Sequence, residues 1–221
     1  MTDNWNLLGH EWAVDMLRQH VARGDIRHAY LLSGSPGIGK RTLALRLAQA
    51  LNCEKPISAG MPCFTCRTCK QIDSMAHPDL TIIQAETEGG TLKVEQVREI
   101  QRTLNLKPYQ SPYRVALFLR FHEANANAAN ALLKTLEEAP SHAVLILTAE
   151  NPEQLLPTIN SRCEILRLRP LPIEAITNDL MDKGVDEDRA RLLAHISGGR
   201  PGFARKLVDD VSLLEKRDEQ L

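Results

Sequence analysis

The residues with the clearest chemical meaning form the pattern Gly-Ser-Pro-Gly-Ile-Gly-Lys at positions 34–40. Glycines in this pattern let backbone N–H groups close around a phosphate, and the lysine reaches the β and γ oxygens of a nucleotide. We therefore expect a phosphate-binding loop, or P-loop, that binds ATP or ADP between a strand and a helix. The residues expected to contact the nucleotide are Gly34, Gly37, Gly39, Lys40, Arg41 and Thr42.

The groups that usually hold Mg²⁺ beside such a loop are missing. A Ser or Thr hydroxyl should follow the lysine, but the residue is Arg41. Thr42 does not replace it, because one step along a helix rotates a side chain by about 100°. The apolar run 115–119 leads to Arg120 instead of a metal-holding Asp and a water-polarising Glu. Phosphoryl transfer depends on Mg²⁺ and positioned charge, so we expect weak nucleotide binding without hydrolysis.

A second chemical pattern is formed by four cysteines with the spacing C-x9-C-x2-C-x2-C, namely Cys53, Cys63, Cys66 and Cys69. Closely spaced thiolates suit tetrahedral Zn²⁺, and a reducing compartment disfavours disulfides between them. Four unrelated thiols are the alternative, which the spacing disfavours. A closed four-thiolate site has no open coordination position, so the expected role of this zinc is structural. The fifth cysteine, Cys163, is expected to be a packing residue.

Short apolar runs that alternate with helical periodicity surround these residues. Strands are expected at 29–32, 80–83, 115–119, 144–147 and 165–166. Helices are expected at about 12–24, 42–51, 94–104 and 130–138. Strands that are apolar on both faces and alternate with helices predict an α/β fold with a parallel sheet covered by helices. After the proline pair at 170 and 172, only helices are expected, at 173–183, 187–196 and 202–214.

Composition limits the possible functions. The chain has 221 residues, 43% of them hydrophobic, and a formal net charge of −1. This charge argues against a protein that coats nucleic acid by bulk charge alone. The first residues lack the basic and apolar stretches of a signal peptide, and no segment approaches 18 uncharged apolar residues. We therefore expect a soluble, cytoplasmic protein.

Two further stretches carry meaning together with the motifs above. Residues 130–140 read Asn-Ala-Leu-Leu-Lys-Thr-Leu-Glu-Glu-Ala-Pro, and residues 161–163 read Ser-Arg-Cys. Alone, they could be an ordinary amphipathic helix and an ordinary surface arginine. In order with His28-Ala-Tyr-Leu, the P-loop and the cysteine insertion, they resemble the bacterial DNA polymerase III clamp-loader branch of the AAA+ family. The resemblance covers nearly the whole chain.

This resemblance implies an organisation into domains. It implies an AAA+ P-loop domain over residues 1–170, with the zinc insertion at about 53–69, and a helical lid domain over 171–221. Clamp-loader subunits continue into a helical collar domain that joins the pentamer, and residues for it are absent from this sequence. The resemblance leaves two explanations open: a truncated chain or a protein that lost its collar.

Because of its departures from the family pattern, the chain is most similar to the delta-prime type of subunit. In that type the nucleotide site is typically degraded, while the Ser-Arg-Cys arginine is kept. The resemblance implies a stator in a heteropentamer with gamma/tau and delta subunits, which loads a sliding clamp onto primed DNA. Arg162 would then be an arginine finger that acts in trans on a neighbour's ATP. A family sensor arginine aligns with Pro201, so we assign no such role to Arg200.

Other interpretations remain open from the sequence. One is a gamma/tau-like motor ATPase that recruits Mg²⁺ through Glu123 or Glu150. Another is a zinc-dependent nucleic-acid-binding module, which is weakened because the insertion has few basic residues and one aromatic, Phe64. Arg41 and Arg120 could supply positive charge in place of the metal, or point to solvent or a carboxylate. Arg162 could merely order its own turn through a salt bridge.

Overall fold

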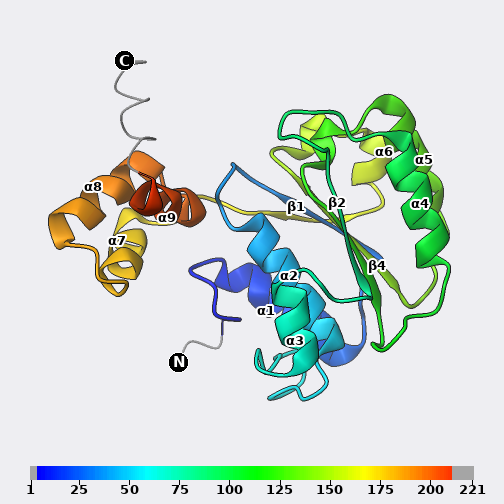
Figure 1. Ribbon diagram of the computed structural model, residues 1–221, viewed down its shortest axis with the longest axis horizontal. Coiled ribbons are helices and arrows are strands. Elements are labelled where there is room, and N and C mark those ends of the chain that lie inside the picture. Colours follow the sequence, from blue (N-terminus) through cyan, green and yellow to red (C-terminus); the bar gives the residue numbers. More distant parts are fainter. Residues whose placement is uncertain (1–3, 211–221) are drawn as a thin grey trace.

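A five-stranded parallel sheet forms the centre of the computed structural model, which describes residues 4–210 (Figure 1). The strand order is β2-β3-β4-β1-β5. The strands are β1 (Ala29–Ser33), β2 (Leu80–Ile83), β3 (Arg114–Phe118), β4 (Ala143–Ala149) and β5 (Glu164–Arg167). The predicted parallel sheet is confirmed, and β1 lies between β4 and β5, so the loop that follows it leaves from the interior of the sheet.

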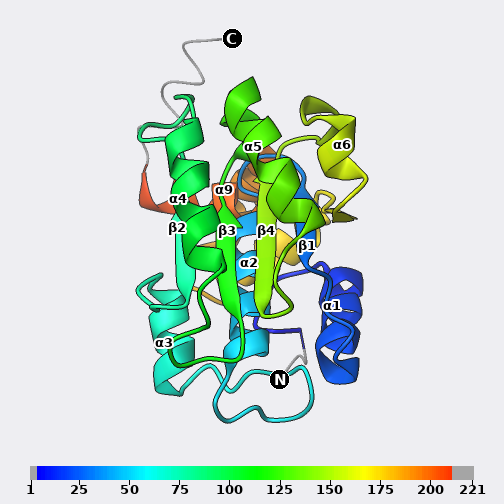
Figure 2. The same cartoon turned by 90° about the vertical axis from the view of Figure 1, so that its right-hand side faces the viewer.

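Helices cover both faces of the sheet (Figure 2). One face packs against α1 (Glu11–Arg23) and α2 (Lys40–Asn52), and the other against α4 (Val94–Leu104) and α5 (Ala126–Glu137). In β4, Val144 and Ile146 face the first layer, whereas Leu145 and Leu147 face the second. Alternate side chains of one strand therefore enter two apolar cores, which explains the uninterrupted apolar runs in the sequence.

Several elements differ from the sequence-based expectation. The helix expected from residue 130 begins at Ala126, because the Asn125 side chain accepts a hydrogen bond from the Ala128 N–H (2.8 Å) and caps the helix there. The short elements α3 (Arg67–Asp73), η1 (Phe121–Glu123), η2 (Pro152–Gln154) and α6 (Pro157–Asn160) were not predicted. They are too short to show apolar periodicity in the sequence.

Three helices follow the sheet and share an apolar cluster of their own. They are α7 (Ile173–Met181), α8 (Glu187–Ser197) and α9 (Pro201–Asp209). The Asp179 carboxylate joins α7 to α9 by accepting two hydrogen bonds from the Arg205 guanidinium, at 3.1 and 3.0 Å. Residues 211–214 of the helix expected at 202–214 lie outside the described part of the chain. We propose that residues 171–221 are the lid domain and 1–170 the P-loop domain.

None of the helices within residues 4–210 has the length and apolar character needed to cross a membrane. The N-terminal and lid segments meet near the P-loop, since Leu8 packs against the lid cluster and Leu171 lies over Gly9.

A buried carboxylate fixes the loop between α4 and β3. Asp79 is fully buried and accepts hydrogen bonds from the backbone N–H groups of Tyr109 (2.6 Å), Gln110 (2.9 Å) and Ser111 (3.1 Å). The Arg114 guanidinium lies 3.5 Å from the same carboxylate. One side chain thus satisfies three backbone donors that no regular element pairs.

We expect Asp79→Asn to lower the free energy of unfolding by about 2–4 kcal/mol, because an amide turns N–H groups toward donors and removes the charge that faces Arg114. Urea unfolding measures this loss. The matched control is Asp25→Asn, whose exposed ion pair with Arg27 should contribute about 1 kcal/mol or less. Equal unfolding midpoints for the two variants would contradict the role of Asp79.

Candidate functional site

The P-loop connects β1 to α2 at the carboxyl edge of the sheet. Its Gly34 N–H donates to the carbonyl oxygens at the end of β4, Ala149 (3.3 Å) and Glu150 (2.9 Å). Gly34, Gly37 and Gly39 have φ values of 144°, 79° and 113°. Side-chain-bearing residues rarely adopt these conformations, so the three glycines are required by the loop's backbone. The first turn of α2 follows directly, with its N–H groups directed toward the loop.

Lys40, the first residue of α2, folds back over the loop. Its ammonium donates hydrogen bonds to the carbonyl oxygens of Gly34 and Ser35, the latter at 3.0 Å. Burial lowers the pKa of Lys40 to about 8, while the nearby Glu150 carboxylate acts in the opposite direction. The loop therefore brings a partly desolvated cation to the place where the sequence predicts phosphate.

Arg41 and Arg120 each contact another side chain of the protein. Arg41 is exposed, and its guanidinium contacts the Met75 sulfur at 2.9 Å. Arg120 follows β3 and its Nε donates to the Glu123 carboxylate at 2.8 Å. The alternative in which Arg120 pairs with a neighbouring carboxylate thus matches the structure. Thr42 is exposed as well.

The same salt bridge occupies one of the two carboxylates considered as metal ligands. The Glu123 side chain is 7% exposed, and its Oε1 accepts both the Arg120 Nε–H and the Gly89 N–H (2.9 Å). Its Oε2 is buried and has no hydrogen-bond partner within residues 4–210, so burial and the Arg120 ion pair, rather than a shortage of lone pairs, stand against Mg²⁺ at this carboxylate. Glu150 is 41% exposed and lies 4.0 Å from His122. The edge where metal-holding acids are expected therefore contains an internal ion pair.

The lid touches the P-loop backbone to backbone. The Gly202 N–H, in the first turn of α9, donates to the Gly37 carbonyl at 2.8 Å. A Cβ at Gly202 would lie 2.9 Å from that oxygen, and one at Gly37 would lie 2.9 Å from the Phe203 nitrogen. Both positions therefore need glycine for this close approach. The sequence patterns gave no indication of the contact.

The four cysteines of the insertion converge as predicted. The sulfur atoms of Cys53, Cys63, Cys66 and Cys69 all lie within 4.8 Å of one another. A tetrahedral zinc with Zn–S bonds of about 2.3 Å requires S···S separations of about 3.8 Å. The cluster therefore has the donor set and the size that could hold one zinc ion.

Backbone N–H groups surround these sulfurs. Cys63, Cys66 and Cys69 donate through their N–H groups to the sulfurs of Cys53 (3.3 Å), Cys63 (3.3 Å) and Cys66 (3.4 Å). Burial raises the pKa of Cys53 and of Cys69. Burial would also raise that of Cys63, but N–H donors from Cys66 and Thr65 outweigh it and lower the pKa to about 6. These donors favour thiolate, the form that binds metal.

The insertion is fixed to the P-loop helix. Cys66 caps α3, and the buried Gln49 side chain of α2 donates to the Cys69 carbonyl at 2.8 Å. The Arg46 guanidinium lies 5.2 Å from the centre of the Phe64 ring and 2.8 Å from the Asp73 carboxylate. Phe64, the aromatic residue of the insertion, is thus engaged within the protein. This contact further weakens the nucleic-acid-binding interpretation.

Arg162 lies in the turn between α6 and β5. Its Nη1 donates to the Thr158 carbonyl (2.8 Å), and its Nη2 donates to the Glu137 carboxylate (2.5 Å). The side chain is 33% exposed, so part of the guanidinium faces solvent. The fifth cysteine, Cys163, is partly buried against the core beside it, and burial raises its pKa to about 12.

Strand pairing separates Arg162 from the P-loop of its own chain. Tyr30 pairs with Glu164 and Ser33 with Arg167, in parallel. Arg162 precedes the amino end of β5, whereas the P-loop follows the carboxyl end of β1. The two groups therefore lie at opposite edges of the sheet, and α6 is displaced from the lid side of the molecule (Figure 1). Arg162 cannot serve a phosphate held by its own P-loop.

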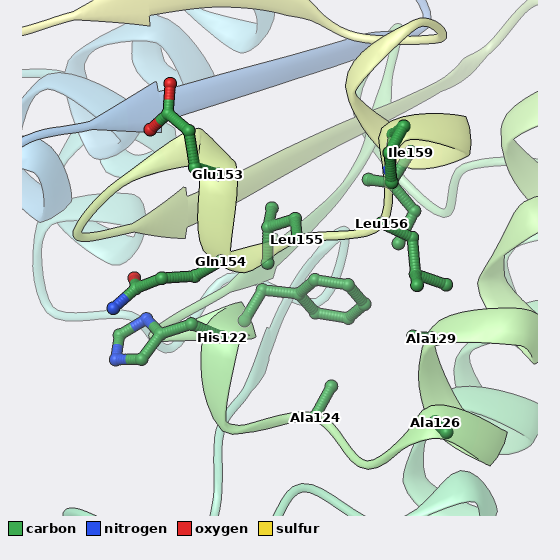
Figure 3. A pocket seen from close by; sticks show the side chains of 11 residues that line it. His122, Ala124, Ala126, Ala129, Glu153, Gln154, Leu155, Leu156 and Ile159 are labelled. Atoms are coloured by element: carbon green, nitrogen blue, oxygen red, sulfur yellow. The ribbon is translucent and has the colours of Figure 1, made fainter.

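A surface cleft lies apart from the P-loop and from Arg162. A cleft of about 330 Å³ lies between η1, the start of α5 and the segment from η2 to α6. Leu155 and Leu156 lie on its apolar side, and His122 and Gln154 lie on its polar side (Figure 3). Its lining includes neither the P-loop nor Arg162. We assign it no ligand.

Curated relatives include delta-prime and tau subunits of DNA polymerase III. The Bacillus subtilis delta-prime subunit is 36% identical over 82% of this chain and 54% of its own length. The Pseudomonas aeruginosa delta-prime subunit is 36% identical over 89% of this chain and 60% of its own. The Escherichia coli tau subunit is 37% identical over 92% of this chain and 32% of its own. The chain thus spans little more than half of these delta-prime relatives.

Solved structures show a similar fold. A gamma-subunit-related protein of DNA polymerase III from Thermotoga maritima has a TM-score of 0.54 and 22% identity, over 84% of this chain and 58% of its own. A RuvB mutant from the same organism has a TM-score of 0.61 and 18% identity, over 96% of this chain and 65% of its own. The family model described as DNA polymerase III, delta subunit matches residues 9–172. The chain therefore belongs to the family of bacterial DNA polymerase III clamp-loader subunits.

Proposed function

We propose that this chain is the P-loop and lid part of a delta-prime-like subunit, a largely non-hydrolysing stator of the clamp loader. The observation that carries the proposal is the Arg120–Glu123 ion pair (2.8 Å) at the edge where a motor would hold Mg²⁺. Arg41, in place of a hydroxyl residue, supports it. Without a metal to neutralise charge on the γ-phosphate, hydrolysis at this P-loop is disfavoured.

A gamma/tau-like motor is the second candidate. The identity to the Escherichia coli tau subunit is 37%, and the identity to each of the two delta-prime relatives is 36%. Overall similarity therefore favours neither type of subunit. The chemistry of the nucleotide site favours the delta-prime-like stator. Steady-state ATP hydrolysis by the purified chain, alone and mixed with a motor subunit, distinguishes them.

The proposed partners are gamma/tau and delta subunits in a cytoplasmic heteropentamer, and through them the sliding clamp and primed DNA. In this assembly Arg162 acts as an arginine finger toward ATP bound by the adjacent subunit. Its place at the edge of the sheet opposite the P-loop supports action in trans. A guanidinium so placed stabilises charge on the transferring phosphoryl group. The proposal also assigns the pentamer contacts to a collar domain in a longer form of the protein.

We further propose that Cys53, Cys63, Cys66 and Cys69 hold a structural zinc ion. All four ligand positions would be filled by thiolates, so the metal would stabilise the fold of the insertion and take no part in a reaction. The N–H donors around the sulfurs support this assignment.

Protein purified without chelator should contain about one equivalent of zinc, as measured by elemental analysis. Cys69→Ser should lose most of it and make residues 53–73 susceptible to proteolysis, because binding energy of the metal is folding energy for the insertion. Cys163→Ser is the matched control and should retain the zinc. Zinc-free wild-type protein, or equal zinc loss in both variants, would contradict the site.

ADP should bind the isolated chain with modest affinity, and Mg²⁺ should change this affinity by about threefold or less, because the metal ligands are missing. Binding should weaken as pH rises above about 8, where Lys40 of the free protein loses its charge. Lys40→Met should abolish this pH dependence. Calorimetric titration at several pH values tests both points. Motor-like ATP hydrolysis, or strong tightening by Mg²⁺, would refute the non-hydrolysing assignment.

Arg162→Ala should leave folding and zinc content unchanged but lower ATP hydrolysis at the bordering site of an assembled clamp loader, by up to about 10³–10⁵-fold. Total hydrolysis should fall by less, since other sites keep their own fingers. Arg162→Lys should not restore the rate, because lysine lacks the planar donor fork. The exposed Arg167→Ala is the control. Wild-type rates in complexes with Arg162→Ala would refute the role in trans.

A further inference from the structure

The Arg162 guanidinium is held from two helices at once. Its Nη1 donates to the Thr158 carbonyl (2.8 Å) and lies 3.4 Å from the Ser161 hydroxyl, while its Nη2 donates to Glu137 Oε1 at 2.5 Å. A guanidinium has five N–H donors in a fixed plane. These contacts use both terminal nitrogens and leave the Nε–H and one Nη2–H without a partner among the described residues, available to an oxyanion. The guanidinium is therefore already oriented in the free chain.

Glu137 is a suitable anchor because its helix is rigidly placed. It is the last residue of α5, whose start is capped by Asn125 and whose Leu132 and Leu136 are buried in the core. A carboxylate at a helix C-terminus is unfavourable, since the helix dipole is negative there. The ion pair with Arg162 offsets this repulsion. The next residue, Glu138, is exposed and makes no such contact among the described residues.

We propose that Glu137 is a positioning residue that holds Arg162 ready for the phosphate of the adjacent subunit. This inference rests on the proposed function of Arg162. A free arginine side chain samples many rotamers, and ordering it during the reaction would raise the barrier. Glu137 orders the arginine side chain beforehand. Its conformational entropy is then lost during folding and does not add to the reaction barrier. Contact with the transferring phosphoryl group remains the task of Arg162 alone.

The expected effect is modest because both side chains are partly exposed, at 33% and 50%. Ion pairs of this kind correspond to about a two- to fivefold change in an equilibrium. Positioning acts in the transition state, so kcat should change while KM for ATP stays within about twofold. A carboxylate that instead competed with phosphate would give the opposite sign, and its removal would speed hydrolysis.

The experiment measures Mg·ATP hydrolysis by the assembled clamp loader with Glu137→Gln, Arg162→Ala and both together. Glu137→Gln should lower kcat at the site that Arg162 borders about two- to fivefold, with unchanged unfolding midpoint and zinc content. In the Arg162→Ala background it should have no further effect, because Glu137 acts only through that arginine. Glu138→Gln is the matched control and should keep the wild-type rate. Glu137→Asp, which keeps the charge, should retain more activity than Glu137→Gln.

Each remaining outcome overturns the inference. A wild-type or higher kcat with Glu137→Gln excludes positioning, as does an equal loss in the Arg162→Ala background, which would indicate a structural role. If Glu137→Gln destabilises the chain, Glu137→Asp becomes the deciding variant. It must lower kcat when Arg162 is present and have no effect in the Arg162→Ala background. Failure here is separable from failure of the proposed function: a silent Arg162→Ala overturns both, whereas a slow Arg162→Ala with wild-type Glu137→Gln overturns this inference alone.

Discussion

Parallel pairing of β1 with β5 is the constraint on which both functional groups depend. Two strands that run in the same direction place their carboxyl ends at one edge and their amino ends at the other. The P-loop leaves the carboxyl end of β1, and Arg162 precedes the amino end of β5. A single chain thus presents a phosphate cradle and a guanidinium that cannot meet each other. In the proposed assembly, the guanidinium of one subunit would instead face the phosphate bound by its neighbour.

Charge placement at the carboxyl edge agrees with this division of roles. The proposed loss of hydrolysis is more than the absence of two acids, because the Glu123 Oε1 atom already accepts hydrogen bonds from Arg120 and from the Gly89 N–H. The Glu123 carboxylate is largely buried, so leaving it without the arginine is costly. Restoring a metal site would therefore require a change of this pair as well as a hydroxyl at position 41.

The sequence predicted what local patterns encode. Glycine and lysine spacing located the P-loop, cysteine spacing located the cluster, and apolar runs located all five strands to within a few residues. The sequence left open that Arg120 and Arg162 pair with carboxylates, but it did not identify their partners, Glu123 and Glu137. The partners of the second pair are separated by 25 positions, and their contact depends on how α5 and α6 pack. Short helices such as α3 depend on capping by Cys66 and on tertiary support, which periodicity does not reveal.

The contact between Gly202 and Gly37 has a mechanical consequence. Peptide groups of the lid and of the P-loop touch without intervening side chains, so there is no compressible layer between them. A displacement of the loop backbone by a fraction of an ångström would be passed directly to the first turn of α9. A ligand that displaced the Gly37 backbone would therefore also displace the start of α9 or break this hydrogen bond.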